Sequence, residues 1–105
     1  MNEVDTRIRS HAKTKTIKLT LHAHQEMVEE AITVSELRTA LETSTLLEDY
    51  PDHKRGACCL VCGEALTGRF VHVVCTADLP DLFIITVYEP KPPKWETPYK
   101  RGKAS

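Results

Sequence analysis

The fold is decided by the stretch Gly56 to Pro90, which reads GACCLVCGEALTGRFVHVVCTADLPDLFIITVYEP. Within it, three apolar segments span residues 57–63, 69–75 and 82–88, and turn-forming residues separate them. Short apolar runs with this punctuation are typical of antiparallel strands joined by short connections. The stretch therefore predicts a three-stranded meander, which also holds all four cysteines of the chain.

The composition of the whole chain is that of one small domain. Its 105 residues are 41% hydrophobic and 28% charged, which is ordinary for a single core. Residues 1–16 show no apolar periodicity and are expected to form a flexible arm, and residues 17–90 to form the domain. The Pro/Lys-rich residues 91–105 are expected to leave it as a tail, with Trp95 either docked on the domain or exposed to a partner.

Hydropathy favours a protein with no membrane partner. No segment reaches the roughly 18 consecutive apolar residues that span a bilayer, and the polar residues 1–18 lack the apolar run of a secretory signal. We therefore expect a cytoplasmic protein. In that reducing compartment the four cysteines are expected to be free thiols.

Charge is distributed unevenly along the chain, although its net value is −1. Residues 1–20 carry five basic and two acidic side chains, residues 21–52 carry one basic and eight acidic, and residues 91–105 carry five basic and one acidic. Both ends can therefore attract an anionic partner, whereas the acidic middle segment repels one.

Two helices are predicted before the meander. Residues 17–21 alternate in polarity and suit an edge strand or an extended lead-in to a first helix over residues 22–31. Thr33 and Glu36 form a capping box, which predicts a second helix from Val34 to about Glu42.

One further strand completes the expected fold. Residues 46–50 are predicted to form a strand that stops at Pro51, because proline has no N–H to donate to the ladder. The fold class is therefore α+β, with two N-terminal helices packed on a roughly four-stranded antiparallel sheet.

Alternation along the meander strands separates an apolar face from a more polar one. The expected core face carries Val71, Val73, Cys75, Phe83, Ile85 and Val87. The opposite face is expected to be open or half open, with His72 beside Thr86 and with Tyr88 near Phe70. Any site should border this second face.

The cysteines resemble half of a zinc site without forming one. Strand alternation sends Cys59 and Cys62 to opposite faces of the sheet, so one ion cannot be bound by both, and no metal site is predicted. The turn before the second strand leaves two registers open. In one Cys58 faces Cys75; in the other, with Gly68 left-handed in a three-residue loop, Cys59 faces Cys75. Redox sensing by this thiol pair is the alternative to simple packing.

Six short motifs are spread over residues 19–96. They are Leu21-His22-Ala23 with Met27, Ile32-Thr33-Val34, Glu48-Asp49-Tyr50-Pro51, Cys59-Leu60-Val61 with Gly63, Val71-His72-Val73-Val74, and Ile85-Thr86-Val87-Tyr88-Glu89-Pro90. This pattern resembles an uncharacterised bacterial family of domains of unknown function. That family is similar to the RelE/ParE toxin superfamily and to the BrnT toxins of toxin–antitoxin systems, and the resemblance implies a RelE/ParE-like α+β fold.

The resemblance also implies a function. It implies a toxin that cleaves messenger RNA as a metal-independent ribonuclease, free or bound to the ribosome, without a cofactor. Its partners would be RNA or the ribosome and an antitoxin of the zinc-finger or helix-turn-helix type. Such cleavage needs a base for the 2′-hydroxyl proton, an acid for the leaving oxygen and a cation for the phosphorane.

Five residues are candidates for these roles. By the resemblance, His22 matches the helix-start histidine of the family and His72 the strand histidine, and both are acid/base candidates. Tyr88 matches the tyrosine that ends the last strand and would orient the reacting groups. Arg55 and Arg69 are the nearest cations and would stabilise the phosphate.

The first helix departs from this ribonuclease pattern. Glu26, Glu29 and Glu30 stand where related toxins commonly carry arginines, and these carboxylates would repel RNA. One alternative is therefore a non-catalytic member of the same fold whose sheet edge or acidic helix binds a protein. The other is a metal or redox module built from the cysteines and His72.

Overall fold

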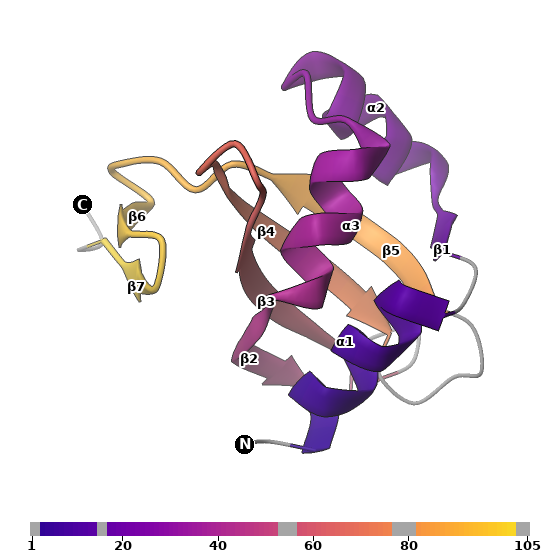
Figure 1. Cartoon of the computed structure of the whole chain (residues 1–105). Coiled ribbons are helices and arrows are strands. Elements are labelled where there is room, and N and C mark those ends of the chain that lie inside the picture. Colours follow the sequence, from indigo (N-terminus) through magenta and orange to yellow (C-terminus); the bar gives the residue numbers. More distant parts are fainter. Residues whose placement is uncertain (1–2, 15–16, 53–56, 77–81, 103–105) are drawn as a thin grey trace.

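The computed structural model describes residues 3–14, 17–52, 57–76 and 82–102 (Figure 1). The elements are α1 (Glu3–Thr14), β1 (Ile17–Leu19), α2 (Leu21–Glu29), α3 (Val34–Glu42), β2 (Thr45–Tyr50), β3 (Cys58–Glu64), β4 (Phe70–Thr76), β5 (Leu82–Tyr88), β6 (Trp95–Thr97) and β7 (Lys100–Arg101). Within these described residues, no helix combines the length and apolar character that crossing a bilayer requires.

The described strands form a mixed five-stranded sheet and a separate hairpin. The order in the sheet is β1-β5-β4-β3-β2, while β6 pairs with β7. β1 runs parallel to β5, and the other neighbours are antiparallel. The α+β class is confirmed, but the expected four-stranded antiparallel sheet is only the larger part of the observed one.

The elements with strong local signals lie where the sequence predicts them. At the start of α3 the Thr33 hydroxyl accepts from the Glu36 N–H at 3.0 Å, and the Glu36 carboxylate accepts from the Thr33 N–H at 3.0 Å. In the β3–β4 turn, Gly68 has a φ of 86°. Cys59 lies opposite Cys75, which confirms the register that requires a left-handed glycine.

A docked helix occupies most of the segment expected to be a flexible arm. Ile8 and Ala12 of α1, four residues apart, are buried in the core. Arg9 donates to the Ser44 carbonyl at 2.8 Å, and Arg38 of α3 donates to the Ala12 carbonyl at 2.5 Å. The expectation is wrong because contacts with the rest of the domain, rather than a long apolar stripe of its own, hold this helix.

A β-bulge in β5 changes which of its side chains reach the core. The β4–β5 register shifts between Val74 and Cys75 and leaves Ile85 as an extra residue. Such a bulge reverses the in–out alternation on either side of it. The residues of β5 in the core are Leu82, Ile84 and Val87. The expectation that Phe83 and Ile85 face the helices is therefore wrong.

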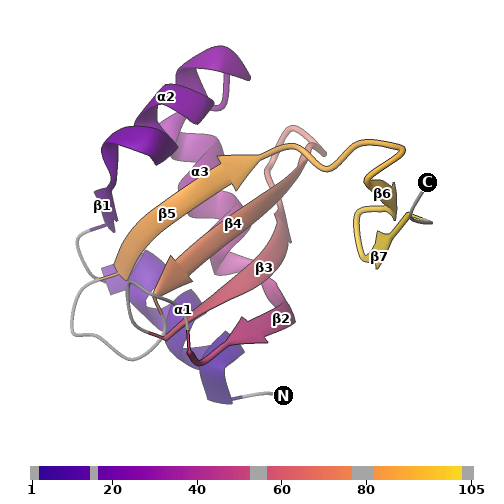
Figure 2. The same ribbon diagram turned by 180° about the vertical axis from the view of Figure 1, so that it is seen from behind.

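The two faces of the sheet are covered by different parts of the chain. The described helices pack on one face (Figure 1), where Val71, Val73 and Cys75 lie in the core as expected. The β6–β7 hairpin lies apart from these helices (Figure 2) and contacts the other face through His72. Trp95 at its start is only 3% exposed. Residues 91–102 of the expected tail therefore do not leave the domain, and Trp95 is docked on it, while residues 103–105 lie outside the described residues.

Two carboxylates, from α2 and from its C-cap, cover the edge of β5 beyond the residues that pair with β1. Glu26 accepts from the Val87 N–H at 2.9 Å, and Glu30 accepts from the Glu89 N–H at 2.9 Å. These oxygens take the place of the carbonyls of a further strand, so the edge N–H groups are satisfied without one. The acidic face of α2 thus has a structural use that the sequence did not indicate.

We expect Gly63→Ala to destabilise the domain, because Gly63 lets β3 approach α3 closely. A Cβ at this position would lie 1.7 Å from the Ala40 carbonyl oxygen, so the helix would have to move. The free energy of unfolding, measured with guanidinium, should fall by about 3 kcal/mol. The control Leu66→Ala, at a turn position that is 90% exposed, should change it by less than about 0.5 kcal/mol. Wild-type stability of Gly63→Ala would contradict the packing described.

Candidate functional site

His72 lies in the middle strand of the meander, on the face opposite the helices. It stands between Cys62 of β3 and Tyr88 of β5 and is 0% exposed. Its Nδ1 is 3.1 Å from the Tyr88 hydroxyl, and its Nε2 is 2.6 Å from the Pro98 carbonyl oxygen. Because a carbonyl can only accept, Nε2 carries the proton. In the neutral ring Nδ1 therefore accepts from the Tyr88 hydroxyl.

Burial keeps both members of this pair neutral. It lowers the pKa of His72 below the usual histidine value, and it raises the pKa of Tyr88. Both shifts follow from the cost of placing a charge away from water. The site thus holds a neutral imidazole next to a protonated phenol.

An ion pair lies beside the histidine. Arg101 Nε is 2.6 Å from Glu48 Oε2, and its Nη2 is 2.8 Å from Oε1, which is a bidentate geometry. Glu48 also accepts from the Tyr50 hydroxyl. The hydrogen bonds from Arg101 hold the pKa of Glu48 at about 2, and burial raises the pKa of Tyr50 to about 12. At neutral pH the carboxylate is therefore ionised and the phenol protonated.

The C-terminal hairpin covers these groups. The Trp95 ring meets the His72 ring edge-on, with centroids 4.4 Å apart. The Arg101 guanidinium lies 4.8 Å from the centroid of the same tryptophan. Next to them, Tyr99 hydrogen-bonds with the Cys62 side chain. We call the following residues the outer-face cluster: Glu48, Tyr50, His72, Tyr88, Trp95 and Arg101.

Of the sequence-predicted site residues, the structure brings His72 and Tyr88 together. Tyr88, rather than Thr86, stands opposite the histidine, and Thr86 faces Val74. The prediction was wrong by two residues along β5. A shift of two keeps every side chain on its face, so polarity alone does not distinguish the two registers.

Two other predicted residues are not part of this cluster. His22 lies on the exposed side of α2, with Nε2 3.4 Å from Glu26 Oε1 one turn further along. This is an i,i+4 surface pair. Arg55 lies outside the described residues.

Arg69 is engaged within the fold instead. Its Nη1 donates to the Ala31 carbonyl at 3.0 Å, its Nη2 donates to the Glu30 carbonyl at 2.5 Å, and its Nε donates to the Glu89 carboxylate at 3.0 Å. Glu36 lies 3.7 Å from Nη1. This side chain thus ties the C-terminal end of α2 to the start of α3 and the end of β5.

Sequence reasoning missed Glu48, Tyr50 and Arg101. A signal for the first two was present, because they alternate on a predicted strand and therefore share a face. Arg101 is 53 residues from Glu48 in the chain, and nothing local predicts that pairing. In the sequence, the only sign that Arg101 would meet a carboxylate was its position in a basic and aromatic segment of the tail.

The cysteines divide between the two faces, as strand alternation predicts. Cys59 and Cys75 belong to the core cluster beneath the helices, whereas Cys62 hydrogen-bonds with Tyr99 on the other side. All four thiols, Cys58 included, are free and buried. Within the described part of the chain, no group of three or more His, Cys, Asp or Glu side chains is placed to hold a metal ion.

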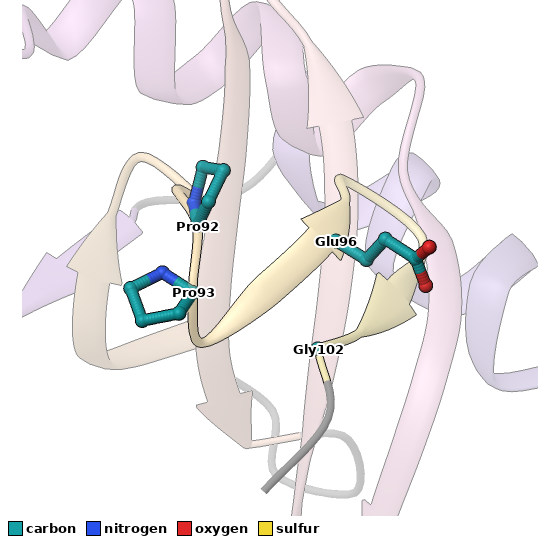
Figure 3. Close-up of a pocket in the computed structure, with 4 residues that line it drawn as sticks. All are labelled: Pro92, Pro93, Glu96 and Gly102. Carbon is teal, nitrogen blue, oxygen red and sulfur yellow. The ribbon is translucent and has the colours of Figure 1, made fainter. Parts of the chain in front are cut away.

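A separate hollow lies within the hairpin. Its volume is about 390 Å³, and it is lined by Pro92, Pro93, Glu96 and Gly102 (Figure 3). Glu96 is the one ionisable group among these lining residues, and no residue of the outer-face cluster is among them. The hollow therefore offers no acid–base pair, and the outer-face cluster is the better candidate site.

Comparison with known proteins gives a family but no described activity. A family model with the description "Domain of unknown function (DUF4258)" matches residues 19–89. No curated protein and no solved structure matches the chain. The matched range includes His72, Tyr88 and Glu48 but stops before the hairpin that carries Trp95 and Arg101.

Arg69→Lys tests the structural assignment of that arginine. A lysine ammonium keeps the charge but cannot reach the two carbonyls and the Glu89 carboxylate at once. We expect the free energy of unfolding, measured by urea titration, to fall by about 2 kcal/mol. The change Arg69→Met, which keeps a flexible apolar stem but removes the charge and all donors, should cost more. If Arg69→Lys had the same free energy of unfolding as the wild type, the hydrogen bonds of Arg69 would contribute little to stability.

The pH dependence of stability tests the burial of His72. Its pKa is lowered in the folded state, so below the unfolded value of about 6.5 the unfolded chain binds a proton that the folded chain does not. Stability should therefore fall as the pH decreases from about 7 to 5. In thermal unfolding, His72→Gln should lose this dependence, whereas His24→Gln, at an exposed position, should keep it. A wild-type melting temperature that stays constant over this range would contradict the assignment.

Proposed function

Because the chain belongs to the DUF4258 family of domains of unknown function, whose description assigns no activity, we propose a function from the outer-face cluster: metal-independent cleavage of RNA. The observation that carries the proposal is the grouping of a neutral imidazole, an ionised carboxylate and a guanidinium around the Trp95 ring. Acid/base groups next to a cation are what phosphodiester cleavage requires.

His72 is the proposed acid/base group. When the Pro98 carbonyl leaves Nε2, the neutral ring carries its proton on Nδ1 and donates it to the Tyr88 oxygen. The unprotonated Nε2 then takes the proton of the ribose 2′-hydroxyl while the 2′-oxygen attacks phosphorus. The bond from phosphorus to the 5′-oxygen then breaks, and the imidazolium returns the proton to that oxygen. The products are a 2′,3′-cyclic phosphate and a 5′-hydroxyl. Tyr88 is a positioning residue, because its hydroxyl holds the ring at Nδ1.

Arg101 is the proposed cation for the charge that develops on the phosphate. A guanidinium binds two phosphate oxygens with the same fork that it presents here to Glu48. It takes the role that the sequence assigned to Arg55 and Arg69, of which Arg69 is engaged by backbone and carboxylate groups elsewhere.

The charge pattern supports the approach of RNA to this face. The hairpin segment carries Lys91, Lys94, Lys100 and Arg101 against a single acidic residue, Glu96. Basic side chains of this density attract a phosphate backbone. Glu26 and Glu30, which would repel it, point their carboxylates at the edge of β5.

The resemblance to RelE/ParE and BrnT toxins fits this chemistry. We infer a toxin of a toxin–antitoxin system that acts on messenger RNA in the cytoplasm, free or at the ribosome. An antitoxin protein of the zinc-finger or helix-turn-helix type would be its partner.

The second candidate function is protein binding without catalysis. It is favoured by the complete burial of His72, both of whose nitrogens already have partners. A histidine in this state is a satisfied structural group unless the hairpin moves. The two functions therefore differ in whether His72 ever meets RNA.

Cleavage of single-stranded RNA by the purified chain, in excess EDTA, tests the proposal. We expect fragments that end in 2′,3′-cyclic phosphate, and we expect His72→Gln to cleave at least about 100-fold more slowly. Glutamine retains an N–H for the Pro98 carbonyl, and circular dichroism would verify the fold. The control His24→Gln, on the exposed side of α2, should cleave at the wild-type rate. A wild-type chain that leaves RNA intact would favour protein binding.

A further inference from the structure

We propose that the C-terminal hairpin, residues 91–102, is a strap that closes the outer-face cluster, and that single-stranded RNA opens it by competing with Glu48 for Arg101. The identity of the opening ligand rests on the proposed ribonuclease function. The closure itself is a property of the fold, and the two can be tested separately.

The strap occupies the position that a substrate would need. The Pro98 carbonyl oxygen accepts from His72 Nε2 at 2.6 Å, so an oxygen atom of the chain itself stands at the nitrogen that faces outward. Trp95 packs edge-on against the same ring. With His72 0% exposed, no RNA group can reach the imidazole while the strap is closed.

The attachment of the strap to the sheet relies on side chains. Its strands are three and two residues long, and among the described strands none of the main sheet pairs with them. Besides the contacts of Pro98 and Trp95 with His72, the Arg101–Glu48 ion pair connects the strap to the sheet, and Lys94 lies 5.5 Å from the Tyr88 ring centroid. Tyr99 adds a hydrogen bond with Cys62 and an edge-on ring contact with Phe70, with centroids 5.8 Å apart. An attachment of this kind, which shares no strand ladder with the sheet, can open without unfolding the domain.

One buried group disfavours the closed state. The indole Nε1 of Trp95 is buried beside the Tyr88 hydroxyl, but it makes no hydrogen bond of regular geometry within the described residues. An unpaired buried donor costs free energy that is recovered when it reaches water. Opening the strap therefore restores a hydrogen bond to this nitrogen, which partly offsets the loss of the contacts listed above.

RNA can compete with Glu48 for the guanidinium of Arg101. The side chains of Arg101 and Glu48 are 51% and 27% exposed, so a phosphate can reach the guanidinium before the strap moves. A phosphodiester presents the arginine fork with two oxygens, as the carboxylate does. Transfer of Arg101 from Glu48 to RNA would break the strap's bidentate contact with the sheet and bring the phosphate next to His72.

The Cys62 thiol reports on opening without any reference to catalysis. Cys62 is 1% exposed, it hydrogen-bonds with Tyr99 of the strap, and burial raises its pKa to about 11. It should therefore react slowly with iodoacetamide while the strap is closed. Mass spectrometry of peptides from the full chain would follow the labelling of this residue.

We expect Glu48→Gln to increase the rate of Cys62 labelling about tenfold, because the charge-assisted pair with Arg101 is lost. Arg101→Gln should have the same effect from the other side of the pair. The matched control is Glu96→Gln. This change removes the same charge from a carboxylate that pairs with Lys100 at 3.3 Å inside the hairpin. Cys62 in this variant should be labelled at the wild-type rate.

RNA should open the wild-type strap in the same assay. A 2′-O-methyl oligonucleotide keeps the phosphates but cannot be cleaved through its 2′-oxygen, and we expect it to increase Cys62 labelling. An oligonucleotide with uncharged methylphosphonate linkages should not. This pair of probes separates opening by phosphate charge from opening by base stacking.

The possible outcomes are distinguishable. Unchanged Cys62 labelling in both Glu48→Gln and Arg101→Gln would overturn the strap. Faster labelling in these variants, with no effect of the 2′-O-methyl oligonucleotide on the wild type, would overturn RNA as the opening ligand. Opening by RNA without cleavage of unmodified RNA would overturn the ribonuclease function and leave the strap supported.

Discussion

The guanidinium of Arg69 joins three elements, and the arrangement of the helix layer depends on it. The chain leaves α2 through Glu30 and Ala31, and the carbonyls of these two residues accept from this one side chain, which also reaches Glu89 just after β5. A planar fork with five donors can do this, and an ammonium group cannot. With α2 held at this end, its carboxylates stand along β5 and its apolar side chains enter the core.

Much of the fold could be predicted because its signals are local. The capping box of Thr33 and Glu36 marks the start of α3. Gly68 left two registers open for the β3–β4 turn, and the structure has the one with a left-handed glycine. Alternation along β3 was sufficient to separate Cys59 from Cys62. For the cap and for the strand alternation, the deciding atoms lie within a few residues of one another, so the sequence alone carries the information.

The rest depends on contacts between distant residues. α1 has few apolar residues of its own and is held by other elements, including Arg38, which donates to its Ala12 carbonyl. The bulge at Ile85 follows from how β4 and β5 pack and pair, and no residue pattern in the sequence predicts it. The site was half predicted for the same reason. His72 and Tyr88 are strand residues on a predictable face, whereas Arg101 reaches Glu48 only after the tail has folded back.

The covered edge of β5 also bears on how this protein behaves at high concentration. A sheet edge with free N–H groups is a template for strand pairing between molecules, and such pairing leads to polymerisation and fibrous aggregates. Glu26 and Glu30 occupy the N–H groups of Val87 and Glu89. At the other end of the sheet, the register shift in β2 and its charged residues Glu48 and Asp49 interrupt a regular edge. The stretch of β5 that extends beyond β1 and the edge strand β2 thus resist pairing with further chains.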